Sequence, residues 1–217
     1  MGKKNKQDPS LLFDQYYREI WCDRWLDLKE ALKEEKNTQV SIDETTPPYW
    51  LDEASLLTAS LLPVTPGSTV LDMCAAPGGK SLVLARAMGK TGFLTANDRS
   101  PDRRERLRKV LYSLTDDIRP EIRITGFNAE SWGLYEKDVY DAVLLDAPCS
   151  SERHVLNDEK YLSQWSQTRP KRLAISQYAM LSSALMAVKE GGYILYSTCS
   201  INPGENEEVV QKLFKRH

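Results

Sequence analysis

The sequence is poor in the residues that build metal sites. Among its 217 residues, only His154 and His217 are histidines, and the four cysteines form no C-x-x-C pair. Structural zinc sites use closely spaced cysteines and histidines, so we expect no metal. The chain also lacks any apolar run near the ~18 residues that a membrane span requires, which excludes an integral membrane protein.

The first ten residues, MGKKNKQDPS, lack the apolar stretch of a secretory signal and the arginine-rich character of a transit peptide. We therefore expect a cytoplasmic protein with reduced cysteines, at least one of which could act as a nucleophile. The net charge of −2 argues against a general polyanion binder but is compatible with a local basic patch.

The length indicates one main domain with an added segment. Residues 1–9 are polar and predicted to be disordered, and residues 10–36 carry apolar side chains at helical spacing. A linker rich in threonine and proline follows, and its Pro47 and Pro48 exclude a regular helix. We place the boundary near residue 45, which divides the chain into an N-terminal helical extension (1–45) and a main domain (46–217).

The main domain alternates between strand-like and helix-like segments. Strands are predicted at 68–75, 92–98, 121–127, 139–148 and 193–200, and helices at 52–62, 81–89, 101–114, 171–192 and 205–216. The 171–192 helix is predicted to end at its glycine pair. This alternation predicts an α/β fold, a parallel sheet with helices on both faces and ligands at the carboxyl ends of the strands.

A glycine-containing loop follows the first main-domain strand and begins two residues after Asp72. It runs Cys74, Ala75, Ala76, Pro77, Gly78, Gly79, Lys80. Small residues let a ligand approach the backbone, and the next helix offers free N–H groups. The spacing is neither G-x-G-x-x-G nor a P-loop, and a plain strand–helix turn is the alternative interpretation.

Asp98 ends the second main-domain strand, where an acid commonly binds ribose hydroxyls, although it could equally cap the next helix. The loop and the acid together favour an adenosine-containing ligand. Because no set of phosphate-binding basic residues accompanies them, S-adenosylmethionine fits better than a nucleoside triphosphate.

Two thiols, Cys149 and Cys199, follow the last two predicted strands, and Asp146 lies three residues before Cys149. Either cysteine could be an ordinary core residue. A thiol beside a methyl donor is needed, however, to methylate carbon 5 of a pyrimidine, because its addition at carbon 6 makes carbon 5 nucleophilic. Asp146 could hydrogen-bond the base during this addition.

The segments LDMCAAPGGKS, AND, LLDAPCS and ILYSTCS together resemble the NSUN (Sun-domain) family of RNA 5-methylcytosine methyltransferases, most closely the mitochondrial ribosomal-RNA branch. The resemblance covers roughly residues 46–210. It implies a Rossmann-like class I S-adenosylmethionine methyltransferase fold acting on ribosomal or transfer RNA. It makes Cys199 the nucleophile and Cys149 the thiol that promotes product release, whereas a DNA cytosine-5 methyltransferase would use the Pro-Cys thiol as nucleophile.

The resemblance also assigns cofactor contacts. Residues 74–80 should cradle the methionine part, with Lys80 near its carboxylate, and Asp98 should hold the ribose. Arg103 occupies the matching place on the following helix, and Asp146 should lie between cofactor and base. The chain departs from the family at Asn128, where an aspartate often accepts the adenine amine. Asparagine can still accept, so we expect cofactor binding to be retained.

Basic residues could contact RNA in two places. The predicted 101–114 helix is rich in arginine, although a solvated face is the favoured interpretation. A second group follows the Pro-Cys motif and contains Arg153, His154, Arg169, Lys171 and Arg172. We also expect the 193–200 strand to form an unprotected sheet edge: either the chain is a fragment that lacks the C-terminal strands usual in the family, or a protein partner or a dimer covers the edge. A non-catalytic RNA- or ribosome-binding scaffold of the same fold is the alternative function.

Overall fold

The computed structural model describes residues 8–34 and 39–216, so the predicted disorder of residues 1–9 lies almost entirely outside the described part. By contacts the chain forms two compact units. The sheet unit holds residues 37–148 and 177–197, and the helical unit holds residues 1–36, 149–176 and 198–217. The segments of the two units alternate along the chain. The division into an extension and a methyltransferase domain stays a prediction.

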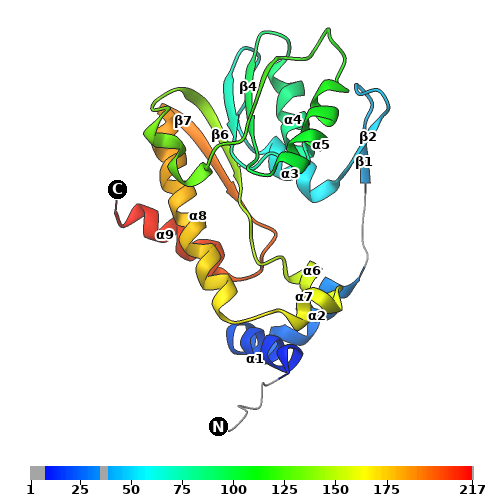
Figure 1. Ribbon diagram of the computed structural model, residues 1–217, viewed down its shortest axis with the longest axis vertical. Helices are drawn as coiled ribbons and strands as arrows, with labels where there is room; N and C mark the ends of the chain where they lie inside the picture. The colour runs from blue at the N-terminus through cyan, green and yellow to red at the C-terminus, as the bar shows by residue number, and fades with distance from the viewer. Residues whose placement is uncertain (1–7, 35–38, 217) are drawn as a thin grey trace. The chain divides into compact units, whose positions relative to one another are not determined.

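The sheet unit is built on five parallel strands in the order β5-β4-β3-β6-β7. The strands are β3 (Thr69–Asp72), β4 (Phe93–Asn97), β5 (Glu121–Thr125), β6 (Tyr140–Asp146) and β7 (Val188–Ser197). Helices α4 (Gly79–Met88) and α5 (Pro101–Tyr112) lie on one side of the sheet, and the part of α8 (Thr168–Ala187) that belongs to the sheet unit, residues 177–187, lies on the other (Figure 1). The predicted α/β architecture is confirmed.

The strand order creates a switch point beside β3. The chain runs from β3 outward through β4 to β5, then returns to the other side of β3 as β6. Crossovers therefore leave β3 in opposite directions and open a crevice at its carboxyl end. Among the described residues, β7 pairs only with β6 and forms a sheet edge, as predicted. Fully buried Val70, Leu71, Leu94 and Leu144 anchor the central strands in the core.

The predicted linker contains an unpredicted hairpin. Strands β1 (Gln39–Ile42) and β2 (Tyr49–Asp52) pair antiparallel and form a separate two-stranded sheet. The prolines prevent a helix, as expected, but they lie in the connection between the strands and leave the pairing segments intact. Asp52 then caps α3 (Glu53–Ser60) by accepting the backbone N–H of Ser55 at 2.8 Å.

The predicted 171–192 helix is wrong at its C-terminus. Helix α8 ends at Ala187, and Val188 already belongs to β7. Val188 pairs with Tyr140, and Lys189 forms a 2.6 Å ion pair with Asp141 of β6. Sheet pairing therefore takes over this segment before Gly191, which lies within β7 at φ +77°.

The helical unit contains α1 (Pro9–Trp21) and α2 (Trp25–Lys33), separated by a 3-10 turn (Cys22–Arg24). The unit also includes α6 (Glu152–Leu156), α7 (Glu159–Ser163), a second 3-10 turn (Pro203–Glu205) and α9 (Glu207–Phe214). Its core is largely aromatic: Phe13, Tyr17, Trp25, Val155 and Trp165. The helical spacing predicted over 10–36 is confirmed where the structure describes it, but Cys22 at φ +49° interrupts it.

Candidate cofactor pocket and thiol pair

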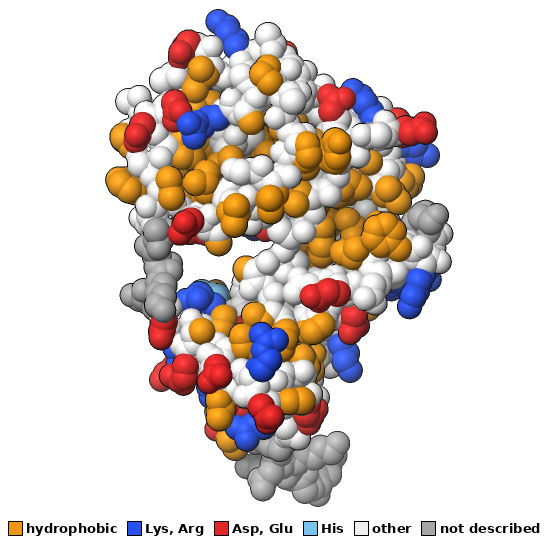
Figure 2. Space-filling model, turned by 180° about the vertical axis from the view of Figure 1, so that it is seen from behind, with side chains coloured by type: hydrophobic (Ala, Val, Ile, Leu, Met, Phe, Trp, Pro, Cys, Tyr) orange, Lys and Arg blue, Asp and Glu red, His pale blue; other side chains and the backbone are white. Residues whose placement is uncertain are grey.

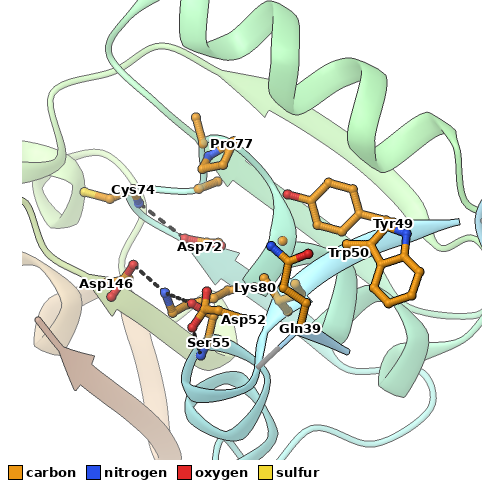
Figure 3. A pocket seen from close by; sticks show the side chains of 14 residues that line it. Gln39, Tyr49, Trp50, Asp52, Ser55, Asp72, Cys74, Pro77, Lys80 and Asp146 are labelled. Carbon is orange, nitrogen blue, oxygen red and sulfur yellow. Dashed lines mark hydrogen bonds and ion pairs between the residues drawn. The ribbon is translucent and has the colours of Figure 1, made fainter. Parts of the chain in front are cut away.

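A cavity of about 370 Å³ lies in the sheet unit at the carboxyl ends of β3 and β6 (Figure 3). Most of the predicted loop lines it: Cys74, Ala75, Ala76, Pro77, Gly79 and Lys80, together with Asp146. The β1–β2 hairpin and α3 supply a wall that the sequence did not predict: Gln39, Tyr49, Trp50, Leu51, Asp52 and Ser55. The sequence signal that could have predicted this wall is the segment YWLDEAS, in which three apolar residues directly precede Asp52, the residue that caps α3.

Two glycines shape the loop at the start of α4. Gly78 lies at φ +121°, a backbone conformation that favours glycine. A Cβ on Gly79 would come within 2.5 Å of Leu51 Cδ1, so a larger residue here would force the Leu51 side chain to shift. Helix α4 begins at Gly79, and its free N–H groups form an anion-binding end.

Lys80 and Asp146 meet inside this cavity. Lys80 Nζ lies 2.9 Å from Asp146 Oδ2 and 3.1 Å from Ser55 Oγ (Figure 3). The other oxygen of Asp146 accepts the hydroxyl of Ser197, at the end of β7, at 2.8 Å. The Lys80 ammonium in this pocket is therefore held between a carboxylate from β6 and a hydroxyl from α3.

Asp72 at the end of β3 is a further acid of the pocket that the sequence reasoning did not select. Its carboxylate accepts the hydroxyl of Ser81 at 2.6 Å and the backbone N–H of Cys74 at 3.3 Å. Burial raises the pKa of Asp72 to about 7. Burial, followed by the nearby charge of Asp72, raises the pKa of Cys74 to about 12, so this pocket thiol stays protonated.

Asp98 and Arg103 support the loop and do not line the cavity. Asp98 accepts the backbone N–H of Ser100 at 2.9 Å and lies 3.4 Å from Arg103. Arg103 also donates to the carbonyl of Ala76. Ser100 caps α5, so the helix-capping alternative for Asp98 is wrong. The neighbouring Arg104 donates to the carbonyls of Asp98 and Arg99, again within the protein.

Asn128 lies in a different cavity of the sheet unit, of about 590 Å³. Its side-chain oxygen accepts the backbone N–H of Glu130 at 3.2 Å and caps a 3-10 turn (Ala129–Leu134). The cavity is otherwise lined by Arg123, Phe127, Ser131, Trp132, Tyr135 and Glu136. The structure thus groups Lys80 and Asp146 with the glycine loop but leaves Asn128 apart from them.

The two strand-end thiols lie together in the helical unit. Cys149 Sγ is 2.8 Å from Cys199 Sγ, and neither of these two cysteines forms a disulfide. Ser151 Oγ lies 2.8 Å from the Cys199 sulfur and 3.7 Å from the Cys149 sulfur. The backbone of Ser151 has a positive φ of +54°. The hydrogen bond with Cys199, together with burial, raises the pKa of the Cys149 thiol well above its usual range. Cys149 is therefore held as the protonated partner of the pair.

Two of the basic residues that follow the Pro-Cys motif make contacts within the protein. Arg153 donates to the carbonyl of Glu34 at 2.5 Å and of Ala31 at 3.3 Å, near the end of α2. The ring of His154 lies 4.3 Å from that of Tyr161. On the face seen in Figure 2, the described acidic and basic side chains are interspersed and form no continuous field of one sign.

In the described part of the chain, no group of three or more potential metal ligands comes together. None of the described helices is long and apolar enough to cross a membrane.

The β5-β4-β3-β6-β7 sheet, with a glycine loop after β3 and acids at its strand ends, defines a Rossmann-like, S-adenosylmethionine-dependent methyltransferase fold. A model of the family 16S rRNA methyltransferase RsmB/F matches residues 59–217. The chain belongs to this family.

Relatives with a known name are similar to most of this chain. The 5-cytosine rRNA methyltransferase NSUN4 of Bos taurus is 44% identical over 169 residues, which cover 75% of this chain and 44% of the relative. Ribosomal RNA small subunit methyltransferase F of Aeromonas hydrophila is 34% identical over 207 residues, which cover 90% of this chain and 42% of the relative. The chain thus spans less than half of either relative.

Among solved structures, PH0851 superposes with a TM-score of 0.79 at 23% identity and covers all of this chain and 61% of that one. NSun6 from Pyrococcus horikoshii with SFG gives a TM-score of 0.68 at 26% identity, and the match covers 80% of this chain and 44% of that one.

Proposed function

We propose that this chain transfers a methyl group from S-adenosylmethionine to carbon 5 of a cytosine in RNA, through a covalent adduct with Cys199. The observation that carries the proposal is the pair of thiols 2.8 Å apart, on loops that directly follow two neighbouring parallel strands. The last residues of the two strands are hydrogen-bonded to each other, because the Ser197 hydroxyl of β7 donates to the Asp146 carboxylate of β6. The names of the relatives, which specify cytosine in rRNA and tRNA, support this reaction.

The pocket residues fit the cofactor. S-adenosylmethionine supplies a methyl group on a sulfonium that carbon 5 can attack. Lys80 and the amino end of α4 offer positive partners for its carboxylate, while Asp72 and Asp146 offer acceptors for its cationic groups. From the resemblance to the family we assign the ribose to Asp98, which is supported by Arg103 next to the glycine loop, and the adenine amine to Asn128, which lines the second cavity of the sheet unit.

The chemistry needs one thiolate and one thiol. Cys199 adds as a thiolate to carbon 6 of the cytosine, while Asp146 hydrogen-bonds the base and favours the electron shift toward carbon 5. Carbon 5 then takes the methyl group. For release, solvent water takes the carbon 5 proton, the C5–H electron pair re-forms the 5,6 double bond, and the carbon 6–sulfur bond breaks so that Cys199 leaves as a thiolate. Cys149, held protonated, promotes this release as a hydrogen-bond donor to the departing sulfur.

Ribosomal RNA is the favoured substrate, with transfer RNA second. The NSUN4 and small-subunit methyltransferase F relatives name rRNA, whereas a Danio rerio relative, 39% identical over 168 residues, names tRNA and a mitochondrial location. The cytoplasmic location inferred from the sequence stays a prediction. A cytosine within a helical stem would have to leave its base stack to reach the thiol.

We also propose that a protein partner or a second copy of the chain covers β7. Within the described ranges 8–34 and 39–216 the strand pairs on one side only, and Tyr193 on it is 54% exposed. Uncovered strand edges invite pairing. Light scattering combined with amide exchange tests this: slow exchange along β7 in a dimer or complex supports it, and equally fast exchange in every state contradicts it.

The test of the reaction is transfer of labelled methyl from S-adenosylmethionine to total RNA by wild type, Cys199→Ala and Cys149→Ala, with a denaturing gel for protein–RNA adducts. We expect label in 5-methylcytosine with wild type, none with Cys199→Ala, and an adduct that accumulates with Cys149→Ala. An adduct that requires Cys149 would instead identify chemistry of the DNA type. No label in any sample, with cofactor bound, would favour the scaffold function.

A further inference from the structure

The residue after each thiol is a buried serine. Ser150 follows Cys149, Ser200 follows Cys199, and their exposed fractions are 1% and 9%. The two hydroxyl oxygens lie 3.0 Å apart, within hydrogen-bond distance of each other. The Cys-Ser dipeptides are therefore joined side by side through the serines as well as the thiols, although the proposed chemistry uses only the thiols.

Two fully buried carboxylates cross between the thiol loops, residues 149–152 and 199–205. Glu152, on the first loop, accepts the backbone N–H of Ile201 on the second loop at 3.1 Å. Glu205, at the end of the second loop, accepts the backbone N–H of Ser150 on the first at 2.9 Å. Each acid thus belongs to one loop and holds the backbone of the other.

The serine hydroxyls fill the space between these acids. Ser150 Oγ contacts both carboxylates. Ser200 Oγ lies 3.0 Å from Glu152 and 3.2 Å from Glu205. Buried carboxylates are costly unless their oxygens accept several hydrogen bonds, and this cluster supplies those bonds from both loops at once.

The N-terminal helix α1 contributes two tyrosines to the same cluster. Tyr17 donates its buried hydroxyl to Glu152, and burial beside that acid raises the pKa of Tyr17 well above its usual range, which keeps it a donor. The hydroxyl of Tyr16 accepts the side-chain N–H of Asn202, on the second thiol loop, at 3.0 Å. Each tyrosine therefore holds one of the two thiol loops.

We propose that Glu152 and Glu205 are positioning residues that hold the two thiol loops together, through Ser150, Ser200 and Tyr17, and so set the separation of Cys149 and Cys199. The acids act through the backbone of the loops that carry the thiols. The inference rests on the proposed function for its purpose, because adduct formation and release need the thiols at a set distance. Its geometry stands without that function.

Bridging of the two thiols by dibromobimane tests the separation directly, because this reagent becomes fluorescent when it alkylates two neighbouring thiols. Peptide mass spectrometry identifies the Cys149–Cys199 bridge without removing Cys22 or Cys74. We expect wild type to bridge readily and Glu205→Ala to bridge about tenfold or more slowly, since small misplacements of reacting groups have effects of that order. A single-site alkylating reagent should still modify each thiol.

Three variants separate positioning from a general loss of structure. Glu205→Gln keeps an oxygen that accepts the Ser150 N–H, so bridging should stay within about threefold of wild type. Glu207→Ala makes the same truncation at an exposed residue two positions away and should bridge normally. If Glu205→Ala does not fold by circular dichroism, Ser200→Ala is read in its place and should slow bridging in the same direction.

Folded Glu205→Ala or Ser200→Ala that bridges at the wild-type rate overturns the inference. Methylation assays then separate the two proposals. We expect Glu205→Ala to lower kcat while leaving KM for S-adenosylmethionine unchanged, because the pocket residues are untouched. Wild type that bridges but never methylates RNA contradicts the proposed function alone. Wild type that methylates, with folded variants that bridge normally, contradicts the positioning role alone.

Discussion

Lys80 of α4 and Asp146 of β6 form a 2.9 Å ion pair at the carboxyl end of the sheet, with the lysine partly shielded at 18% side-chain exposure. The pair joins the glycine loop to the strand that leads into Cys149. In the proposed function Lys80 binds the cofactor carboxylate, and Asp146 hydrogen-bonds the target cytosine. Lys80 can therefore orient Asp146 as well as bind an anion.

Replacing Lys80 with methionine should weaken S-adenosylmethionine binding by about tenfold to a hundredfold, because a charge-assisted hydrogen bond contributes roughly 1.5–3 kcal/mol. Isothermal titration calorimetry measures the affinity. Lys90→Met, an exposed lysine after the same helix, is the matched control and should bind normally. Equal affinities for the two variants would remove Lys80 from the cofactor site.

Stability should rise as the pH falls from 8 toward 5. The pKa of Asp72 is about 7 in the folded protein against 3.8 ordinarily, so between these values the folded state holds a proton that the unfolded chain lacks. The contribution is roughly 4 kcal/mol at most. Urea unfolding across this range should show the slope, and Asp72→Asn should flatten it.

Glu121→Gln removes an exposed carboxylate on β5 and serves as the control for this pH dependence. It should keep the wild-type slope. A slope that survives in Asp72→Asn would mean that another group takes up the proton.

Cys74 should resist alkylation although it lines a cavity. Its pKa of about 12, raised first by burial and then by Asp72, leaves about a thousandfold less thiolate at pH 8 than an ordinary thiol has. Iodoacetamide labelling followed by peptide mass spectrometry gives the rate, with exposed Cys22 as the internal reference. Labelling of Cys74 as fast as Cys22 would show that the pocket thiol is ionised.

Asn128→Asp should bind S-adenosylmethionine as well as wild type does, or up to about tenfold more tightly. A carboxylate accepts an amine more strongly than an amide oxygen does, and aspartate preserves the cap on the Glu130 N–H. Ser131→Asp places the same charge elsewhere in that cavity and should bring no gain. Weaker binding by Asn128→Asp would count against an adenine contact at this position.

The strands of the main sheet were predictable because each is a short apolar run followed by small or polar residues. Residues 140–146, for example, can bury only as a central strand, and their apolar side chains are indeed buried. The β1–β2 hairpin was missed because its strands are four residues long and half exposed, so Pro47 and Pro48 dominated the local signal. The end of α8 was misplaced because pairing with β6 outweighed the helix-ending role of a glycine.

The candidate site also has a part that the sequence predicts and a part that only the folded structure shows. The sequence by itself determined which residues follow the strand ends, because parallel strands bring their carboxyl ends to one edge of a sheet. Cys74 to Lys80, Asp146 and the two thiols were found on that ground. Only the tertiary structure decided that Lys80 pairs with Asp146, that the hairpin walls the pocket, and that Glu152 and Glu205 cross between the thiol loops. Those contacts join residues up to 66 positions apart, and close packing of the folded chain, which has no local sequence signal, selects them.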